Sequence, residues 1–229
     1  MILIYVMADI HGFANRYEEI MAQIALQPDD HLYILGDVID RLPDGIDLLM
    51  EFMGIPNITV LLGNHEHMML ETIDSNYHPY YARRWFANGG SITLDAFEAL
   101  PSDDQSRLLQ FLRSLPLNVD VSVNGINYLL VHGAPVSTFN KTTTKYPDER
   151  THAVWKRLDR YSRMPEGKTV IFGHTPTDHY QPASPLRIWH GDQMIGIDCG
   201  SATRHDGRLA CLRLDDMKEF YSSTFDVDT

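Results

Sequence analysis

The sequence has few cysteines, no long apolar segment and no excess of basic residues. Only Cys199 and Cys211 occur, without a C-x-x-C pair or the cysteine framework of secreted proteins, so we expect a reduced, cytoplasmic protein. No run approaches the roughly 18 apolar residues that a transmembrane helix needs, which argues against a membrane-spanning protein. The apolar start, Met1–Met7, lacks a basic region, and we interpret it as a first buried strand rather than a signal peptide.

The chain also lacks the basic surplus that is typical of proteins that bind nucleic acid or anionic membranes. Its 31 acidic and 19 basic residues give a formal net charge of -12. This charge argues against both kinds of partner, because each needs a basic face. It is unfavourable for a phosphate-bearing substrate too, but two divalent cations would add about four positive charges locally. The net charge therefore does not decide what a metal-containing site would bind.

What is present is typical of one soluble α/β domain. A chain of 229 residues, 44% hydrophobic and 22% charged, is long enough to bury a large core. Strand-like and helical segments alternate in its first part, and this βαβαβ pattern predicts a parallel sheet with right-handed crossovers. No repeat or linker interrupts the chain, so we expect a single domain over residues 1–229. The expected elements are strands at 2–7, 31–35 and 58–62, helices at 14–26 and 43–53, and a further helix from His65.

The second part of the chain has a different pattern. Residues 76–116 lack strand-like runs and are predicted to form a helical insert over one face of the fold. Asn124-Gly125, between two apolar runs, is typical of a type I′ turn and predicts a hairpin over 119–131. The polar, aperiodic stretch 137–148 is expected to be a loop at the mouth of the site. Further strands are expected at 169–172, 186–189, 194–197, 209–214 and, more weakly, 220–224.

Five short polar motifs each follow a strand-like run. In open α/β sheets, ligands bind beyond the carboxyl ends of the strands, so separate strands can deliver these side chains to one crevice. The adjacent glycines are expected to let the backbone turn sharply beside the site. Carboxylate, imidazole, amide and guanidinium groups together suit two neighbouring metal ions and a phosphate. The motifs are Asp9-Ile10-His11-Gly12, Gly36-Asp37-Val38-Ile39-Asp40-Arg41, Gly63-Asn64-His65-Glu66, Val131-His132-Gly133 and Gly173-His174-Thr175-Pro176.

In order and content, the motifs resemble the phosphoprotein phosphatase family of binuclear metallophosphatases, particularly its short bacterial and phage members. The family pattern is D-x-H, G-D-x-x-D-R-G, G-N-H-E, H-G and G-H, and the matches run from Asp9 to His174, about three quarters of the chain. Arg41 and Glu66 favour this family over the wider metallophosphoesterase superfamily, which often has G-N-H-D. The resemblance implies a calcineurin-like α/β fold, a four-layer α/β/β/α sandwich of two mixed sheets with helices outside.

The resemblance further implies a centre of two divalent metal ions, with Mn preferred and Fe or Zn as alternatives. A hydroxide shared by the two ions would attack phosphorus in line, without a covalent enzyme intermediate. The implied ligands are Asp9 and His11 on the first ion, Asp37 bridging both ions, and Asn64, His132 and His174 on the second.

Other residues are implied to bind the phosphate and the leaving group. His65 would be the general acid, held protonated and oriented by Asp40. Arg41 would grip the phosphate, because a planar guanidinium matches two oxygens, and Asn64 would also contact it. A second phosphate-binding arginine is expected in an L-W-x-R-like segment. Val154-Trp155-Lys156-Arg157 nominates Arg157, with Arg160 and Arg163 as competitors.

The sequence departs from the family pattern at a few positions. Leu42 replaces the glycine after Arg41, which affects the local turn but not the ligands, and Ala8 replaces the glycine before Asp9. Cys199 stands where the family has threonine in I-D-T-G. Although Arg204 follows it in the C-x5-R spacing of cysteine-dependent phosphatases, the intervening residues lack the expected glycines. We therefore expect Cys199 to pack near the site rather than to act as a nucleophile.

The leading functional hypothesis is a metal-dependent phosphomonoester hydrolase. The implied substrates are phosphoserine, phosphothreonine or phosphotyrosine proteins, or a small phosphoester. One alternative is a symmetrical diadenosine tetraphosphate hydrolase, which cleaves a pyrophosphate bond with the same core but tends to be longer. A second is a non-catalytic, metal-bound binding module, which the intact ligand and acid positions disfavour. The sequence does not separate the two hydrolases, because specificity depends on the insert and the loops.

Overall fold

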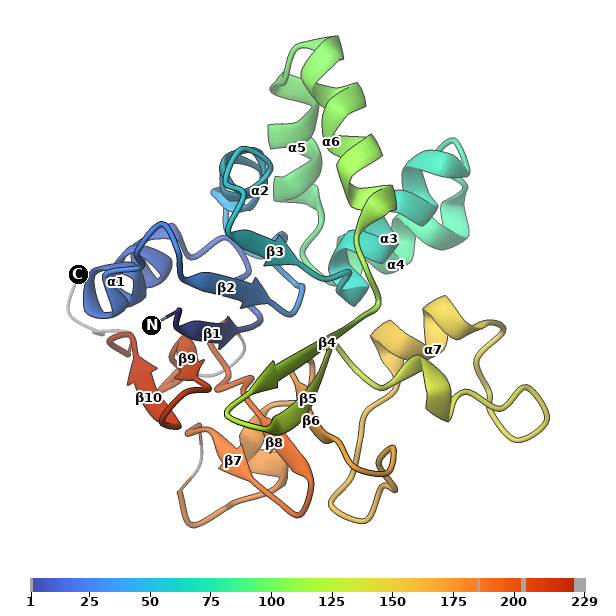
Figure 1. Ribbon diagram of the computed structural model, residues 1–229. Coiled ribbons are helices and arrows are strands. Elements are labelled where there is room, and N and C mark those ends of the chain that lie inside the picture. Colours follow the sequence, from blue (N-terminus) through green and yellow to red (C-terminus); the bar gives the residue numbers. More distant parts are fainter. Residues whose placement is uncertain (1, 185, 203–204, 225–229) are drawn as a thin grey trace.

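Two mixed β-sheets dominate the computed structural model, which describes residues 2–184, 186–202 and 205–224 (Figure 1). Each sheet has five strands in the described part of the chain, in the orders β10-β9-β1-β2-β3 and β4-β5-β6-β8-β7. The first sheet contains β1 (Ile4–Met7), β2 (His31–Ile34), β3 (Ile58–Val60), β9 (Ala210–Arg213) and β10 (Lys218–Tyr221). The second contains β4 (Asn118–Val123), β5 (Ile126–Val131), β6 (Thr169–Phe172), β7 (Trp189–His190) and β8 (Met194–Gly196).

The first sheet follows the predicted βαβαβ pattern. β1 pairs with β2, and β2 with β3, in parallel, whereas β9 and β10 extend the other edge in antiparallel pairing. β1 is buried along nearly its whole length, as expected for a continuous apolar strand with chain on both faces. The predicted fold class of two mixed sheets with helices is therefore confirmed.

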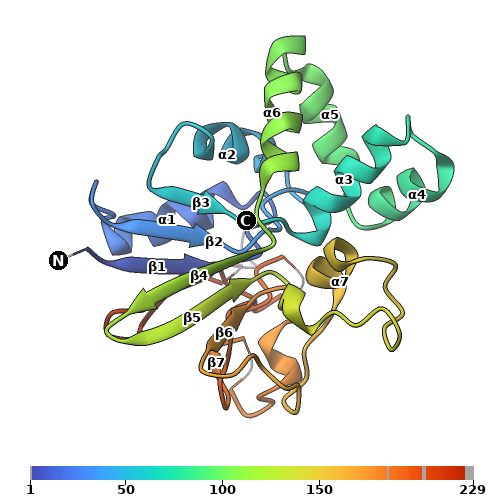
Figure 2. The ribbon, with the colours of Figure 1, turned by 45° about the vertical axis from the view of Figure 1, so that its right-hand side comes forward.

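Helices cover the outer face of the first sheet and extend beyond β3. α1 and α2 pack on the sheet, and their apolar faces join one large core with Met7, Leu32 and Val60. Figure 2 shows α3, α4, α5 and α6 grouped on the β3 side of the molecule. The helices are α1 (Ala14–Ile24), α2 (Gly45–Phe52), α3 (Asn64–Asp74), α4 (Pro79–Ala87), α5 (Ser91–Ala99), α6 (Ser102–Ser114) and α7 (Glu149–Trp155).

The second sheet begins with the predicted hairpin. β4 and β5 pair antiparallel, and Asn124 and Gly125 both have positive φ values, 51° and 80°, as a type I′ turn requires. A second apolar core lies between the two sheets and includes Val6, Leu130 and Ile171. The sheets therefore pack face to face, and their strand ends face the same crevice.

The outer face of the second sheet has a thinner covering. Leu158, Met164 and Tyr180, from irregular chain and the short turn η2 (Thr177–His179), pack there on Phe172. The helix α7 was not predicted. It packs against α3 and η1 (Val136–Thr138) rather than on this sheet.

Several predicted boundaries need correction. Pro43 precedes α2, whose N-cap is Asp44, and the strand expected at 186–189 is reduced to Trp189–His190. The single domain over 1–229 and the insert over 76–116 stay predictions. Among the helices that the structure describes, none has the length and apolar character needed to cross a bilayer.

Candidate metal centre

Buried donor atoms converge where the strands of both sheets end. Two overlapping groups have ligand atoms within 4.8 Å of one another, and Asp37 belongs to both. One group adds His11 and His65, and the other adds His132 and His174. The first group thus contains the expected acid His65, in addition to the expected ligand His11.

A cavity of about 90 Å³ lies at this point. It is lined by every predicted site residue except Asp40 and His132, which lie behind the lining. His132 still reaches the cluster, because its Nε2 lies 2.9 Å from Asn64 Oδ1 and 3.4 Å from Asp37 Oδ1. The residues lining the cavity that sequence reasoning did not place there are Asn88, Trp155, Pro176 and Asp198.

The site residues adopt an uncommon backbone conformation. Asp and His tolerate the left-handed region better than most non-glycine residues, and they are also the residue types that bind metals. The same residue types are therefore suited both to metal binding and to the left-handed backbone conformation. The site residues with positive φ are Asp9 (59°), His11 (52°), Asp37 (54°), Asp40 (71°), Arg41 (73°) and His174 (63°).

Of the five motif glycines, Gly12 (φ 72°) and Gly36 (φ 87°) have the left-handed conformation expected of sharp turns, whereas the other three are required by close packing. Gly63 and Gly173 are outside the left-handed region, but a Cβ on Gly63 would lie 2.2 Å from Asp37 Oδ1, and one on Gly173 would lie 2.4 Å from Asp9 Oδ2. Any larger residue would therefore displace a carboxylate. Leu42, in place of the family glycine, is accommodated because the left-handed residues are Asp40 and Arg41.

Glu66 holds the loop that carries Asp37. Its carboxylate accepts hydrogen bonds from the backbone N–H groups of Asp37 (2.9 Å), Val38 (2.8 Å) and Gly63 (3.1 Å). Burial, followed by the charge of Asp37, raises the pKa of Glu66 to about 7. Its role is structural, and it connects the second and third motifs.

The imidazole rings of the site are arranged so that each neutral ring could offer a nitrogen lone pair to a metal ion. His11 Nδ1 lies 3.0 Å from the Ile39 carbonyl oxygen, and His132 Nδ1 lies 2.6 Å from that of Leu35. If each Nδ1–H donates to its carbonyl, Nε2 keeps a lone pair toward Asp37. Burial lowers the pKa of both rings, and burial and the charge of His132 lower that of His174 to about 3. Neutral imidazole is the form that binds metals.

The carboxylate groups of the cavity lie close together and repel one another electrostatically. Burial raises the pKa of Asp9 well above its usual range, and the charges of Asp198 and Asp37 raise it further. Burial also raises the pKa of Asp198 to about 6. Divalent cations among these groups would offset both the desolvation and the repulsion. The donor set of carboxylate, amide and neutral imidazole therefore fits hard or borderline divalent ions.

His65 is held by Asp40. Its Nδ1 lies 2.6 Å from Asp40 Oδ2, whereas its Nε2 lies 3.3 Å from Arg41 Nη2 and 3.8 Å from Asp37 Oδ2. Burial lowers the pKa of His65, but the charge of Asp37 and the hydrogen bond and charge of Asp40 together outweigh it, so the pKa is raised overall. The two carboxylates favour a protonated ring, whereas the Arg41 guanidinium, which can only donate, opposes protonation of Nε2.

Two residues that sequence reasoning missed fix Asp40 in turn. Trp85 on α4 donates its indole N–H to the Asp40 carboxylate at 3.0 Å, and Thr93 on α5 donates its hydroxyl at 2.7 Å. All three side chains are buried, with Asp40 and Trp85 at 0% exposure. The predicted helical segment thus holds Asp40, the partner of the expected acid His65.

The structure separates the three candidate arginines. Arg157 lines the small cavity, as does Arg41. Arg160 and Arg163 line a different cavity, and Arg160 donates to the Tyr180 carbonyl at 2.5 Å.

Cys199 is buried in the core between the sheets, where burial and then the charge of Asp198 raise its pKa well above the usual range. This placement agrees with packing rather than nucleophilic attack. Arg204, the partner that a cysteine-dependent mechanism would need, lies outside the described residues.

Comparisons with known proteins give relatives with two activities. The family model for calcineurin-like phosphoesterases matches residues 2–197. Serine/threonine-protein phosphatase 2 of Escherichia coli (strain K12) is 29% identical over 220 residues, which cover 92% of each chain. The symmetrical bis(5'-nucleosyl)-tetraphosphatase of Acidovorax sp. (strain JS42) is 30% identical over 131 residues, 56% of this chain and 43% of that protein.

A solved structure gives a likeness of fold alone. It is a protein serine/threonine phosphatase from Saccharomyces cerevisiae, with a TM-score of 0.61 and 13% sequence identity. The match covers all of this chain and 81% of that one.

Proposed function

Because this chain belongs to the calcineurin-like phosphoesterase family and is a hydrolytic enzyme, we propose that its substrates are phosphoserine and phosphothreonine proteins, with phosphotyrosine proteins as a further class. The observation that carries the proposal is the buried His65–Asp40 pair, supported by Trp85 and Thr93, beside the cavity. A serine or threonine alkoxide is a poor leaving group and needs a proton. The likeness to a serine/threonine phosphatase over 92% of each chain supports the same substrate class.

The buried donors would hold two divalent ions, for which we propose Mn, with Fe or Zn as alternatives. When bound, such ions supply a water of lowered pKa as nucleophile and positive charge for the phosphoryl oxygens. The residues that we propose as ligands are Asp9, His11, Asp37, Asn64, His132 and His174.

The chain's own groups would bind the phosphate and deliver the proton. Arg41 and Arg157 line the cavity and would hold phosphoryl oxygens through their planar guanidinium groups. Asn64 would add an amide contact. His65 would donate its Nε2 proton to the leaving oxygen, while the Nδ1 contact with Asp40 keeps the ring oriented.

Symmetrical hydrolysis of diadenosine tetraphosphate is a second candidate. It is supported by the likeness over 131 residues to a protein of which this chain spans less than half. The cationic side chains of Lys145, Lys156 and Arg157, which line a larger cavity beside the small one, also support it. Its leaving group, a nucleoside diphosphate, departs as a stable anion and makes less demand on His65. A non-catalytic module is set aside, because the chain is a hydrolytic enzyme.

A substrate comparison tests the proposal. Metal-stripped protein and protein reloaded with Mn, Fe or Zn would be assayed on a phosphoserine peptide, a phosphotyrosine peptide and diadenosine tetraphosphate. We expect metal-dependent turnover with the highest kcat/KM on a phosphopeptide. A preference for the dinucleotide, with two diphosphates as products, would replace the proposed function by the second candidate.

A further inference from the structure

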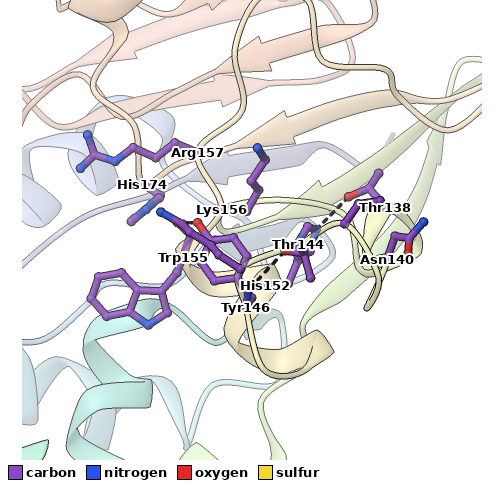
Figure 3. Close-up of a pocket in the computed structure, with 11 residues that line it drawn as sticks. Thr138, Asn140, Thr144, Tyr146, His152, Trp155, Lys156, Arg157 and His174 are labelled. Carbon is purple, nitrogen blue, oxygen red and sulfur yellow. Dashed lines mark hydrogen bonds between the residues drawn. The ribbon is translucent and has the colours of Figure 1, made fainter.

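A larger cavity opens next to the candidate metal centre. Its volume is about 670 Å³, and it shares Trp155, Arg157 and His174 with the small cavity. Figure 3 shows its side chains coming from the loop that carries Thr138 and Tyr146 and from the end of α7. We call this cavity the groove. A substrate whose phosphate lies among the metal-site residues would have its neighbouring groups in the groove.

The charge of the groove is opposite to that of the whole chain. Lys145, Lys156 and Arg157 line it, and no described carboxylate does so, although the chain has a net charge of -12. Within the described ranges, none of these three cations forms a salt bridge. His152 also lines the groove, but burial lowers its pKa, so it adds no positive charge at neutral pH. The groove thus offers described cationic groups without a salt-bridge partner, although Lys145 Nζ lies 5.4 Å from the centroid of the Tyr146 ring.

The aromatic side chains of the groove are already engaged with the protein. The Tyr146 hydroxyl donates to the Trp155 carbonyl at 3.0 Å, and the Tyr146 ring packs edge-on against His152. Trp155 has the Arg84 guanidinium over its ring at 5.5 Å and His174 edge-on at 6.1 Å. The aromatic surface on which a nucleobase could stack is therefore limited. The groove would bind a ligand mainly through its positive charge.

We propose that the groove binds acidic side chains that flank the phosphorylated residue of a polypeptide substrate. The inference rests on the proposed protein phosphatase function and adds a sequence preference to it. Lys145 and Lys156 are the selecting residues, and they lie outside the small cavity that holds the candidate ligands. Each exposed charge pair contributes modestly, so the preference is moderate and falls with ionic strength.

The test compares matched peptides in one protein. Two phosphoserine peptides of equal length carry either glutamate or glutamine at the positions on both sides of phosphoserine, and kcat/KM is measured for each with Mn. We expect the glutamate peptide to be preferred about three- to tenfold at low salt. In the K145Q/K156Q variant the preference should fall close to one. Because the preference is a ratio within one protein, a general loss of activity cancels.

Lys168 supplies the control. It lies just before β6, at the opposite end of that strand from His174, and pairs with Asp120 on the surface. The Lys168→Gln variant removes one positive charge, half of what K145Q/K156Q removes, at a site away from the groove, and should keep the wild-type preference.

Three results would overturn the inference. One is equal kcat/KM for both peptides in the wild type, and another is an unchanged preference in K145Q/K156Q. Equal loss of preference in the Lys168→Gln variant would attribute the effect to net charge alone. Turnover of diadenosine tetraphosphate but of neither peptide is a different result, because it removes the protein phosphatase function itself.

Discussion

The small cavity and the groove share three residues, yet they are built in opposite ways. The cavity consists mostly of buried side chains that backbone and side-chain hydrogen bonds hold in place, several of them in the left-handed conformation. The groove consists mainly of exposed and partly buried residues on a loop and at the end of a short helix. We infer from this difference that the two regions have separate functions. The residues of the cavity would carry out the reaction, and those of the groove would determine which substrate is preferred.

This comparison makes a general prediction about substitutions. A substitution of a cavity residue should reduce turnover of every substrate, or of every substrate that has a poor leaving group. A substitution in the groove should instead alter the ratio of kcat/KM between substrates. Burial alone should not decide the size of an effect. The predictions below run from the largest expected effect to the smallest.

Asp37→Asn should have the largest effect, because Asp37 belongs to both candidate ligand groups. We expect turnover of every substrate to fall by at least about 10³-fold. Metal content, measured by mass spectrometry of the purified protein, should fall as well. Asp47→Asn, the same change at an exposed position in α2, is the control. Retained metal-dependent activity would contradict a bridging role for Asp37.

His65→Asn should separate substrates by their leaving group. We expect a loss of about 10²- to 10³-fold on a phosphoserine peptide and a much smaller loss on p-nitrophenyl phosphate, because nitrophenolate departs without a proton. His67→Asn, at the neighbouring histidine, is the control. Metal content should stay at the wild-type level. A parallel loss of metal would instead make His65 a ligand, as its place beside His11 and Asp37 allows.

Trp85→Phe sharpens the comparison, because Trp85 acts only through Asp40. Loss of the indole donor should lower kcat on the phosphoserine peptide about tenfold, with little change on p-nitrophenyl phosphate or in KM. The lost buried hydrogen bond should also lower stability by about 1–3 kcal/mol, measured by denaturant unfolding. Trp189→Phe, on the second sheet, should keep the wild-type ratio of the two rates. Equal losses on both substrates in the Trp85 variant would mean a purely structural role.

Cys199→Ala should have the smallest effect, although Cys199 is as buried as the site residues. We expect less than about a twofold change in kcat/KM, because a buried structural thiol takes no part in the reaction. Steady-state kinetics on the phosphoserine peptide would measure it. If a folded variant had no turnover, Cys199 would again be a candidate nucleophile. The distinction between residues that are merely buried and residues that act in the reaction would then fail.

Sequence reasoning predicted most of the sheet strands and the place of the candidate site at their carboxyl ends. The motifs follow apolar runs, and parallel strands bring their carboxyl ends together, so Asp9, Asp37 and Asn64 could be expected at one edge. His132 and His174 follow the same rule in the second sheet. The Asn124-Gly125 turn was predictable because few sequences suit positive φ at two successive positions.

Other features depend on contacts that spacing does not encode. Trp85 and Thr93 are far from Asp40 along the chain, and only the packing of α4 and α5 brings them to it. α7 is short, and its pattern is not distinct from that of the polar loop before it. Asp198, the aspartate in the I-D-T-G-like segment before Cys199, lines the cavity, but no metal-ligand spacing in the sequence marks it.

The left-handed conformation of the site residues also limits how the motifs can vary. Glutamate would supply the same carboxylate as aspartate at positions 9, 37 and 40, but it lacks the tolerance of aspartate for positive φ and adds a methylene to a closely packed site. Glycine would relax the backbone and leave no ligand. Glutamate, which conserves the chemistry, and glycine, which suits the backbone conformation, are therefore both excluded at these positions. The motifs have little room to drift, so long as the enzyme remains under selection for activity.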